Sequence, residues 1–244
     1  MSLVLGAVCV AVSAFIKGAI GFGFPTLATP LMSLFLDVKT AMVVLILPNI
    51  VMDAIQLVRR GAPPAIVRRM AWLLPFGALG TVVGTHLLAV MPSRTVLLVL
   101  GCFVILFVAL NATRFSPRLP PRWEPWASPI VGLVAGVVGG ITNVPGTPLV
   151  IYFYALGMAK HEFVASVALT FVIYKLVQLG SVALYGLLSW RLLVASLGCT
   201  AVALAAFHGG LMVQDRLEQH AFNRAVLVFL GGLGLFLIAR ATRG

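Results

Sequence analysis

Charged residues are scarce in this chain. Asp, Glu, Lys and Arg make up 9% of its 244 residues, against roughly 25% in soluble domains, while 61% of the residues are hydrophobic. Because so few charges cannot cover a water-facing surface, the outer surface must face lipid. The backbone must satisfy its own hydrogen bonds in lipid, which leaves helices or closed barrels. Long uniform apolar runs, without the alternation of barrel strands, predict an all-α polytopic integral membrane protein.

The sequence also lacks the residues that catalysis or metal binding would need. It contains only six acidic residues and no HExxH, GxSxG or P-loop motif. Its three cysteines, Cys9, Cys102 and Cys199, lie inside apolar runs and match no metal-ligand or disulfide spacing. We therefore expect no enzyme activity, no cofactor and no metal. No basic stretch precedes the first apolar residues, so a cleaved signal peptide is not expected.

The apolar residues fall into ten segments, from which we predict about eight membrane crossings. A crossing needs about 20 mostly apolar residues, and two of the segments, 26–36 and 145–157, are too short. Each short segment follows a break rich in glycine and proline, at 17–25 and 136–148. The ten segments are 2–22, 26–36, 40–58, 70–91, 95–112, 126–142, 145–157, 163–188, 191–213 and 222–240.

The two breaks align without a gap, which predicts an internal repeat. The first repeat would span 1–112 and the second 126–244, and the polar, proline-rich stretch 113–125 would link them. Chance matching of glycines in a glycine-rich membrane chain is the alternative. The matched pairs are Gly18 with Gly136, Gly21 with Gly139, Thr29 with Thr147, Pro30 with Pro148, Leu31 with Leu149, Gly61 with Gly186 and Gly101 with Gly231.

The net charge of +11 bears on topology rather than on nucleic acid, for which we expect no affinity. The basic residues sit between apolar segments, ten on one side of the membrane and five on the other. Four crossings in each half would make the repeats parallel, with both termini inside. Re-entrant hairpins at the breaks would make them inverted, with the N-terminus outside. The charge distribution fits both arrangements, and both place the loop 59–69 and the linker 113–125 in the cytoplasm.

A helix that breaks inside the membrane survives only where it is buried in protein or lines a cavity. A second half-helix is expected to begin at each break, near Thr26 and near Gly146, and its free N–H groups and positive dipole end can bind an anion. Close helix packing is the alternative role of the glycines. The break residues predicted to contact a substrate are Gly21, Gly23, Phe24, Thr26, Asn143, Gly146 and Thr147.

Three ionisable residues, Lys17, Asp53 and Lys175, lie inside apolar segments, where charge is costly and usually functional. The lysines are predicted to meet an anionic substrate. The alternatives are an ion pair that only neutralises Asp53, or a Lys17 that reaches the membrane surface. The sequence fits Asp53 equally as a proton carrier and as a static counter-ion.

Two helix faces complete the predicted site. Asn49 shares a face with Asp53 and Gln56 through i, i+4, i+7 spacing, and we expect Asn49 and Asp53 to serve coupling or ion pairing. The aligned face of the other half carries Tyr174 and Gln178, beside Lys175, and we expect these three to contact the substrate.

The breaks, the repeat and the size resemble the sulfite exporter TauE/SafE family, also called the 4-toluene sulfonate uptake permease family. The resemblance implies a secondary transporter of sulfite, sulfoacetate or related organosulfonates, often an exporter, coupled to an ion gradient, in the bacterial inner membrane. It covers nearly the whole chain, although its glycine-rich motifs are soft, and Lys175 stands outside the general pattern. The residues that carry it are Gly18, Gly21, Gly23, Pro25, Thr29-Pro30-Leu31, Gly136, Gly139, Gly140, Pro145 to Leu149, Gly186 to Trp190 and Gly231 to Gly234.

Other functions stay open at this point. A passive anion channel would share the broken helices but need a continuous pore. A non-transporting membrane scaffold would tolerate neutral replacements of its buried charges, and a membrane enzyme is the weakest alternative. The expected partners are a small anion and the lipid bilayer, and both a monomer and a homodimer fit the sequence.

Overall fold

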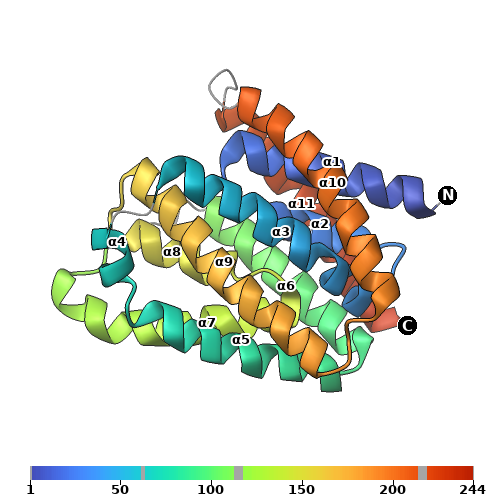
Figure 1. Ribbon diagram of the computed structural model, residues 1–244, viewed down its shortest axis with the longest axis horizontal. Helices are drawn as coiled ribbons and strands as arrows, with labels where there is room; N and C mark the ends of the chain where they lie inside the picture. Colours follow the sequence, from blue (N-terminus) through green and yellow to red (C-terminus); the bar gives the residue numbers. More distant parts are fainter. Residues whose placement is uncertain (1, 62–63, 113–117, 214–218, 244) are drawn as a thin grey trace.

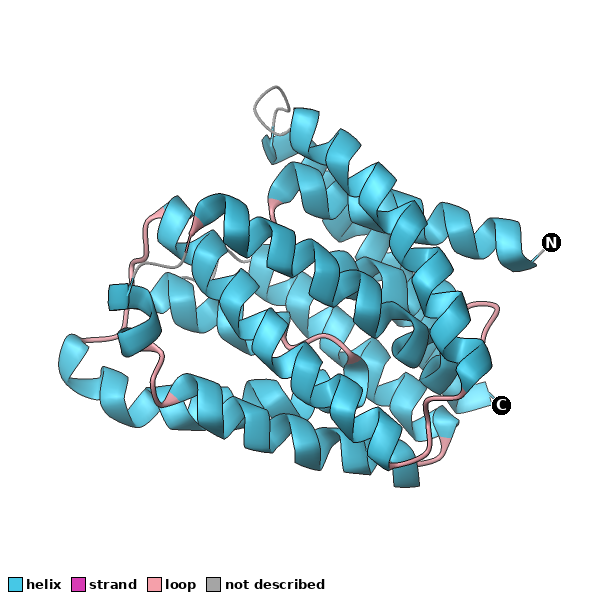
Figure 2. Ribbon diagram, viewed as in Figure 1, coloured by secondary structure: helices cyan, strands magenta, loops and turns pink. Residues whose placement is uncertain are grey.

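Helices form all the regular structure in the described part of the chain, residues 2–61, 64–112, 118–213 and 219–243 of the computed structural model (Figure 2). The helices are α1 (Ser2–Ile20), α2 (Phe24–Met32), α3 (Val38–Arg60), α4 (Pro64–Arg69), α5 (Leu73–Val90), α6 (Ser93–Ala112), η1 (Pro121–Trp123), α7 (Glu124–Thr142), α8 (Gly146–Ala155), α9 (Lys160–Leu184), α10 (Trp190–Val213) and α11 (Gln219–Arg243). Residues 113–117 of the predicted linker and 62–63 of the loop 59–69 lie outside the described residues.

The helices match the ten predicted segments, with α4 and η1 as short additions. Six of them are long and apolar enough to cross a bilayer: α3, α5, α6, α7 together with η1, α9 and α10. Shorter apolar stretches occupy α1 and α11. The chain is therefore a polytopic helical membrane protein, while the number of eight crossings stays a prediction.

Each broken segment folds back on itself. Gly6, near the start of α1, lies against the side chain of Met32 at the end of α2. In the other half, the amide of Leu119, just before η1, donates to the carbonyl of Ala155 at the end of α8 (2.9 Å). Both short helices thus run back along the helix before them, as two hairpins (Figure 1).

Helices of the two halves interleave on the flanks of the bundle. Helix α7 packs on α5, and α10 packs on α1 (Figure 1). The α5–α7 contact is so close that a Cβ on its glycines would strike the backbone of the facing helix, as Gly80 would meet the carbonyl of Leu133. Gly-xxx-Gly spacing permits this approach in membranes. The glycines are Gly80 and Gly84 on α5 and Gly132, Gly136 and Gly140 on α7.

The same packing applies to Gly18 of α1, whose Cβ would meet the carbonyl of Phe207 on α10. Close helix packing, the alternative weighed for these glycines, is therefore what the structure shows for Gly18, Gly136 and Gly140. Other glycines shape the chain instead. Gly61 caps the end of α3 with φ of 72°, and Gly186 lies just after α9 with φ of 71°. Residues with a side chain rarely adopt this backbone conformation.

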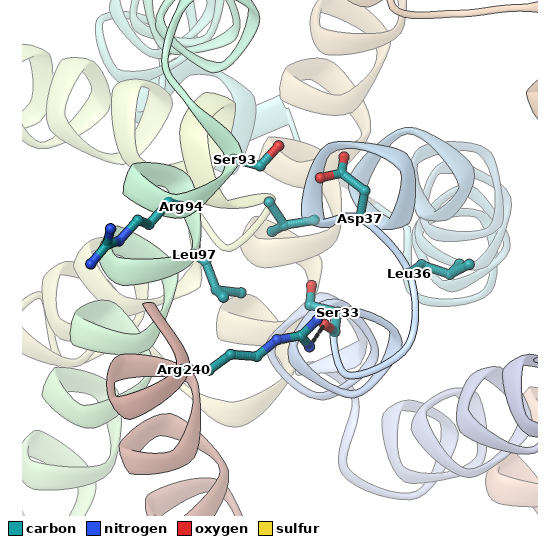
Figure 3. A pocket seen from close by; sticks show the side chains of 8 residues that line it. Ser33, Leu36, Asp37, Ser93, Arg94, Leu97 and Arg240 are labelled. Atoms are coloured by element: carbon teal, nitrogen blue, oxygen red, sulfur yellow. Dashed lines mark hydrogen bonds between the residues drawn. The ribbon is translucent and has the colours of Figure 1, made fainter. Parts of the chain in front are cut away.

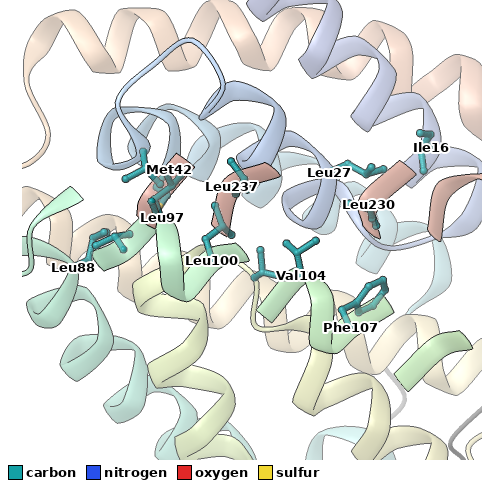
Figure 4. Packing of buried hydrophobic residues seen from close by; sticks show 14 residues of the cluster. Ile16, Leu27, Met42, Leu88, Leu97, Leu100, Val104, Phe107, Leu230 and Leu237 are labelled. Atoms are coloured by element: carbon teal, nitrogen blue, oxygen red, sulfur yellow. The ribbon is translucent and has the colours of Figure 1, made fainter. Parts of the chain in front are cut away.

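Helices α6 and α11 face each other across an apolar cluster that also receives side chains from α2 and α3. Figure 4 shows Leu100, Val104 and Phe107 of α6 opposite Leu230 and Leu237 of α11. Because lipid tails are as apolar as these side chains, the cluster holds the helices together by close van der Waals packing. It fixes α2 and α3 against the rest of the bundle.

Helices α3 and α9 cross the middle of the molecule side by side and run in opposite directions (Figure 1). Each follows one of the short helices, α2 or α8. The polar faces predicted for the two halves are thereby buried at the centre, next to both breaks.

Candidate functional site

The first break is built by two glycines. Gly21 and Gly23 have φ of 100° and 99°, so the chain leaves α1 in a conformation that an L side chain would strain. Helix α2 begins at Phe24, two residues before the predicted start, with Gly23 as its N-cap. Gln56 of α3 holds the bend in place because its Nε2 donates to the carbonyl of Gly21 (2.6 Å).

Lys17, in the last turn of α1, is fully buried. Its Nζ donates to Oδ1 of Asp53 (2.5 Å) and to Oδ1 of Asn49 (3.3 Å), both on α3. The same ammonium lies 5.8 Å from the ring centre of Phe171 on α9, which adds a cation–π attraction. Lys17 is thus an ion pair with Asp53 and does not reach the membrane surface.

The second break bends at an asparagine instead of at glycines. Asn143 ends α7 with φ of 67°, in the left-handed region that asparagine tolerates. After Val144 and Pro145, α8 begins at Gly146. The two breaks therefore align in sequence but bend through different residues.

Lys175 of α9 reaches this second break. Its Nζ donates to the backbone carbonyl of Asn143 (3.1 Å), to Oδ1 of the same residue and to Oε1 of Gln178 (2.6 Å). Gln178 in turn donates from Nε2 to the carbonyls of Gly139 and Gly140 (both 3.3 Å). All three acceptors of Lys175 are neutral oxygens, so its charge has no direct carboxylate partner.

One hydrogen bond joins the two halves of the site. Nδ2 of Asn143 donates to Oγ1 of Thr29, on α2 (3.3 Å). Asp53 also lies within electrostatic reach of Lys175. The two breaks and the two lysines therefore belong to one buried polar centre.

Several polar atoms in this centre are buried without a hydrogen-bond partner. They are Nδ2 of Asn49, Oδ2 of Asp53, Oε1 of Gln56 and Oγ1 of Thr147, in the first turn of α8. A buried polar group without a partner is costly, so a cluster of such groups is typical of a site that binds a polar ligand. Donors and acceptors are both among them, which fits a polar ligand.

The centre is closed to both sides of the membrane in this structure. Lys17, Asp53 and Lys175 are at most 1% exposed. A cavity of about 130 Å³ lies at the end of α2 (Figure 3). There Arg240 of α11 donates to the carbonyls of Ser33 (2.7 Å) and Leu34 (2.9 Å). These hydrogen bonds satisfy two backbone carbonyls at the C-terminal end of α2.

An ion pair ties the opposite end of the bundle. Arg69 of α4 donates to both carboxylate oxygens of Glu124, at the start of α7 (2.5 and 2.9 Å). The hydrogen bond to Glu124 raises the pKa of the Arg69 guanidinium above its usual value. This pair links α4 to the second hairpin.

Most of the predicted site residues come together at this centre. Lys17, Asn49 and Asp53 form one contact group, and Lys175, Asn143 and Gln178 form the other. Gly21 and Gly23 shape the first bend, and Thr26 is buried in the first turn of α2. Gly146 and Thr147 open α8.

Two predicted residues make their contacts elsewhere. The hydroxyl of Tyr174 donates to the carbonyl of Leu73 on α5 (2.9 Å), and its ring lies over Gly77. The side chain of Phe24 packs in an apolar cluster with residues of α1, α3 and α10. The structure thus gives both side chains a packing role.

Gln56, predicted to share the face of Asn49 and Asp53, also lies at the centre. Two further residues were missed as parts of the site: Thr29 and Phe171. Thr29 was visible in the sequence, in the aligned Thr-Pro-Leu motif. Phe171 lies one turn before Lys175, but an aromatic residue in an apolar helix carries no signal of its own. Only the position of the Lys17 ammonium over its ring reveals it.

Comparison with known proteins identifies the family. A family model described as Sulfite exporter TauE/SafE matches residues 5–237, nearly the whole chain. The chain therefore belongs to the sulfite exporter TauE/SafE family, which makes it a membrane transporter of sulfite-type anions. The resemblance noted at the breaks is thereby confirmed. No curated protein and no solved structure gives a match.

Proposed function

We propose that this member of the TauE/SafE family is a secondary transporter that exports small sulfur-containing anions, such as sulfite, sulfoacetate and other organosulfonates, coupled to an ion gradient. The observation that carries the proposal is Lys175, a fully buried ammonium that meets only neutral oxygens at a helix break. A buried charge without a counter-charge is expensive. An anionic substrate would supply that counter-charge.

The second break offers an oxoanion the contacts that it needs. Substrate oxygens can replace the neutral acceptors that now surround Lys175. The first turn of α8 adds backbone N–H groups and the unpartnered hydroxyl of Thr147. The buried Nδ2 of Asn49 is a further donor without a partner. Together they can replace much of the hydration shell that the anion loses on entry.

We further propose that residues 1–112 and 126–244 are inverted repeats. Three observations support this interpretation: the hairpins at the two breaks, the opposite directions of α3 and α9, and the positive φ of both Gly61 and Gly186. Inverted repeats with a midplane site at interrupted helices are typical of secondary transporters that open alternately to each side. The closed centre then corresponds to an occluded step of that cycle.

The orientation follows from the same chain direction. With re-entrant hairpins, the side with ten basic residues holds the loop 59–69 and the linker 113–125. We propose that this side faces the cytoplasm of a bacterial inner membrane and that both termini lie outside. Figure 1 places both ends of the chain at the same end of the bundle, which fits an even number of passages.

Ligand-induced stabilisation tests the substrate class directly. Purified protein would be melted with sulfite, sulfoacetate, taurine, sulfate and acetate. A ligand at 100 times its Kd stabilises the folded state by about 2.7 kcal/mol, which corresponds to a rise in Tm of about 5–10 °C for a chain of this size. Selective stabilisation by a sulfite or sulfonate is expected, and no shift with any of the five would refute the proposal.

Flux through proteoliposomes separates a transporter from a passive anion channel. A transporter gives uptake that saturates with substrate concentration and changes after a pH step. A channel gives currents that grow in proportion to the driving force. The burial of both lysines favours the transporter, because lysines that line a continuous pore would be exposed to water.

A further inference from the structure

The buried centre contains two lysines and one carboxylate. Lys17 forms an ion pair with Asp53, whereas Lys175 donates only to neutral oxygens. The charge of the site therefore depends on whether Lys175 is protonated and on whether a further carboxylate lies nearby.

The hydrogen bonds of Lys175 fit an ammonium. The carbonyls of Gly139 and Gly140 can only accept, so the Nε2 of Gln178 must face them and its Oε1 must face Lys175. The backbone carbonyl of Asn143 also only accepts. With Oδ1 of Asn143 as the third, Nζ contacts three acceptors. A neutral amine has two N–H donors and an ammonium has three.

Asp53 is the only carboxylate at this centre in the described part of the chain. Asp37 caps the start of α3, Glu124 pairs with Arg69 at the start of α7, and Glu162 lies in the first turn of α9. The other two acidic residues, Asp215 and Glu218, both lie in 214–218, outside the described residues. Two ammonium groups and one carboxylate leave one positive charge.

We infer that, within the substrate class proposed above, the site selects anions with a single negative charge, such as hydrogensulfite or a simple alkanesulfonate, over dianions such as sulfate and sulfoacetate. A monoanion neutralises the buried centre, whereas a dianion leaves one negative charge uncompensated. The unpartnered Oδ2 of Asp53 adds repulsion against that second charge. This inference rests on the proposed function because it describes the substrate of the same site.

Asp53 is then the residue that sets the charge of the accepted substrate. Replacing it with asparagine removes one negative charge and leaves two lysines, which favours a dianion. Replacing Lys17 as well restores a single positive charge. The pair of variants Asp53→Asn and Lys17→Met/Asp53→Asn therefore separates charge from the loss of the carboxylate itself.

Binding of methanesulfonate and sulfate to the purified full chain tests the inference, because each keeps its charge near neutral pH. We expect the wild type to bind methanesulfonate at least about 100-fold more tightly, the cost of burying an uncompensated charge. Asp53→Asn should lower that ratio at least about tenfold, and Lys17→Met/Asp53→Asn should restore it.

Each outcome has one meaning. A wild type that binds sulfate as tightly as methanesulfonate overturns the charge selection and leaves the transport proposal standing. A double variant that prefers sulfate also overturns it, even if Asp53→Asn alone does not fold. A wild type that binds neither probe, nor sulfite or sulfoacetate, refutes the proposed function itself.

Discussion

Replacing Lys175 with methionine removes the ammonium that lacks a carboxylate partner and keeps a side chain of similar length. A hydrogen bond to a charged group contributes about 1.5–3 kcal/mol, so the Kd for a sulfonate should rise about 10- to 150-fold. The substitution has two opposing effects on the stability of the folded protein. Three buried oxygens lose their donor, at about 1–3 kcal/mol each, but a costly buried charge is removed as well. Binding should therefore change much more than stability.

The assay is titration calorimetry on purified protein, with the Tm measured in parallel without ligand. Lys39→Met is the matched control, because Lys39 is a partly buried lysine at the start of α3 whose Nζ donates to a single carbonyl, that of Ala89 (2.9 Å). It should leave the Kd unchanged within a factor of two or so. An unchanged Kd in Lys175→Met, with the protein folded, would remove Lys175 from the substrate site.

Three other substitutions give separable results. Thr147→Val removes an unpartnered buried hydroxyl, so the ligand-free Tm should rise while sulfonate affinity falls about 2- to 10-fold; a loss of Tm would contradict a ligand role. Gly84→Leu drives a side chain into the carbonyl of Val137 and should cost about 1–3 kcal/mol of stability by thermal melting, whereas Gly180→Ala, in open space, should cost nothing. Arg240→Gln frees the carbonyls at the end of α2 and should speed amide exchange at 33–36, which unaltered exchange would refute.

The helical architecture could be predicted from the sequence because lipid imposes one strong rule: an apolar run must be a helix. All ten predicted segments have a matching helix, and both short helices follow their predicted breaks. The short α4 was not foreseen, since a helix of six residues is too short to give a hydropathy signal. The direction of α2 and α8 could not be predicted either, because the ten-to-five distribution of basic residues is the same for hairpins and for continued helices.

The site could be predicted by type of residue but not by partner. Buried charge marked Lys17, Asp53 and Lys175 in advance, because such groups are rare in membrane helices unless they function. Which lysine pairs with Asp53 depends on the depth and rotation of α1, α3 and α9, which hydropathy does not contain. Tyr174 was placed at the site because it shares a helix face with Gln178, yet the glycine at position 77 opens a space for its ring on α5.

The proposed repeats carry different charges at aligned positions. This difference would assign substrate binding to one half and ion coupling to the other. Lys17 aligns with Ala135, and Asp53 aligns with Gln178, so the Lys17–Asp53 ion pair exists in the first half alone. In the proposed site, Lys175 of the second half meets the substrate charge, which leaves the ion pair free to serve the proposed coupling. Lys17→Met/Asp53→Asn keeps the single positive charge but removes the pair. We expect this variant to bind methanesulfonate and to carry it down its gradient, yet to show no response to an imposed pH gradient in proteoliposomes. Continued pH-driven accumulation by the double variant would show that coupling resides elsewhere.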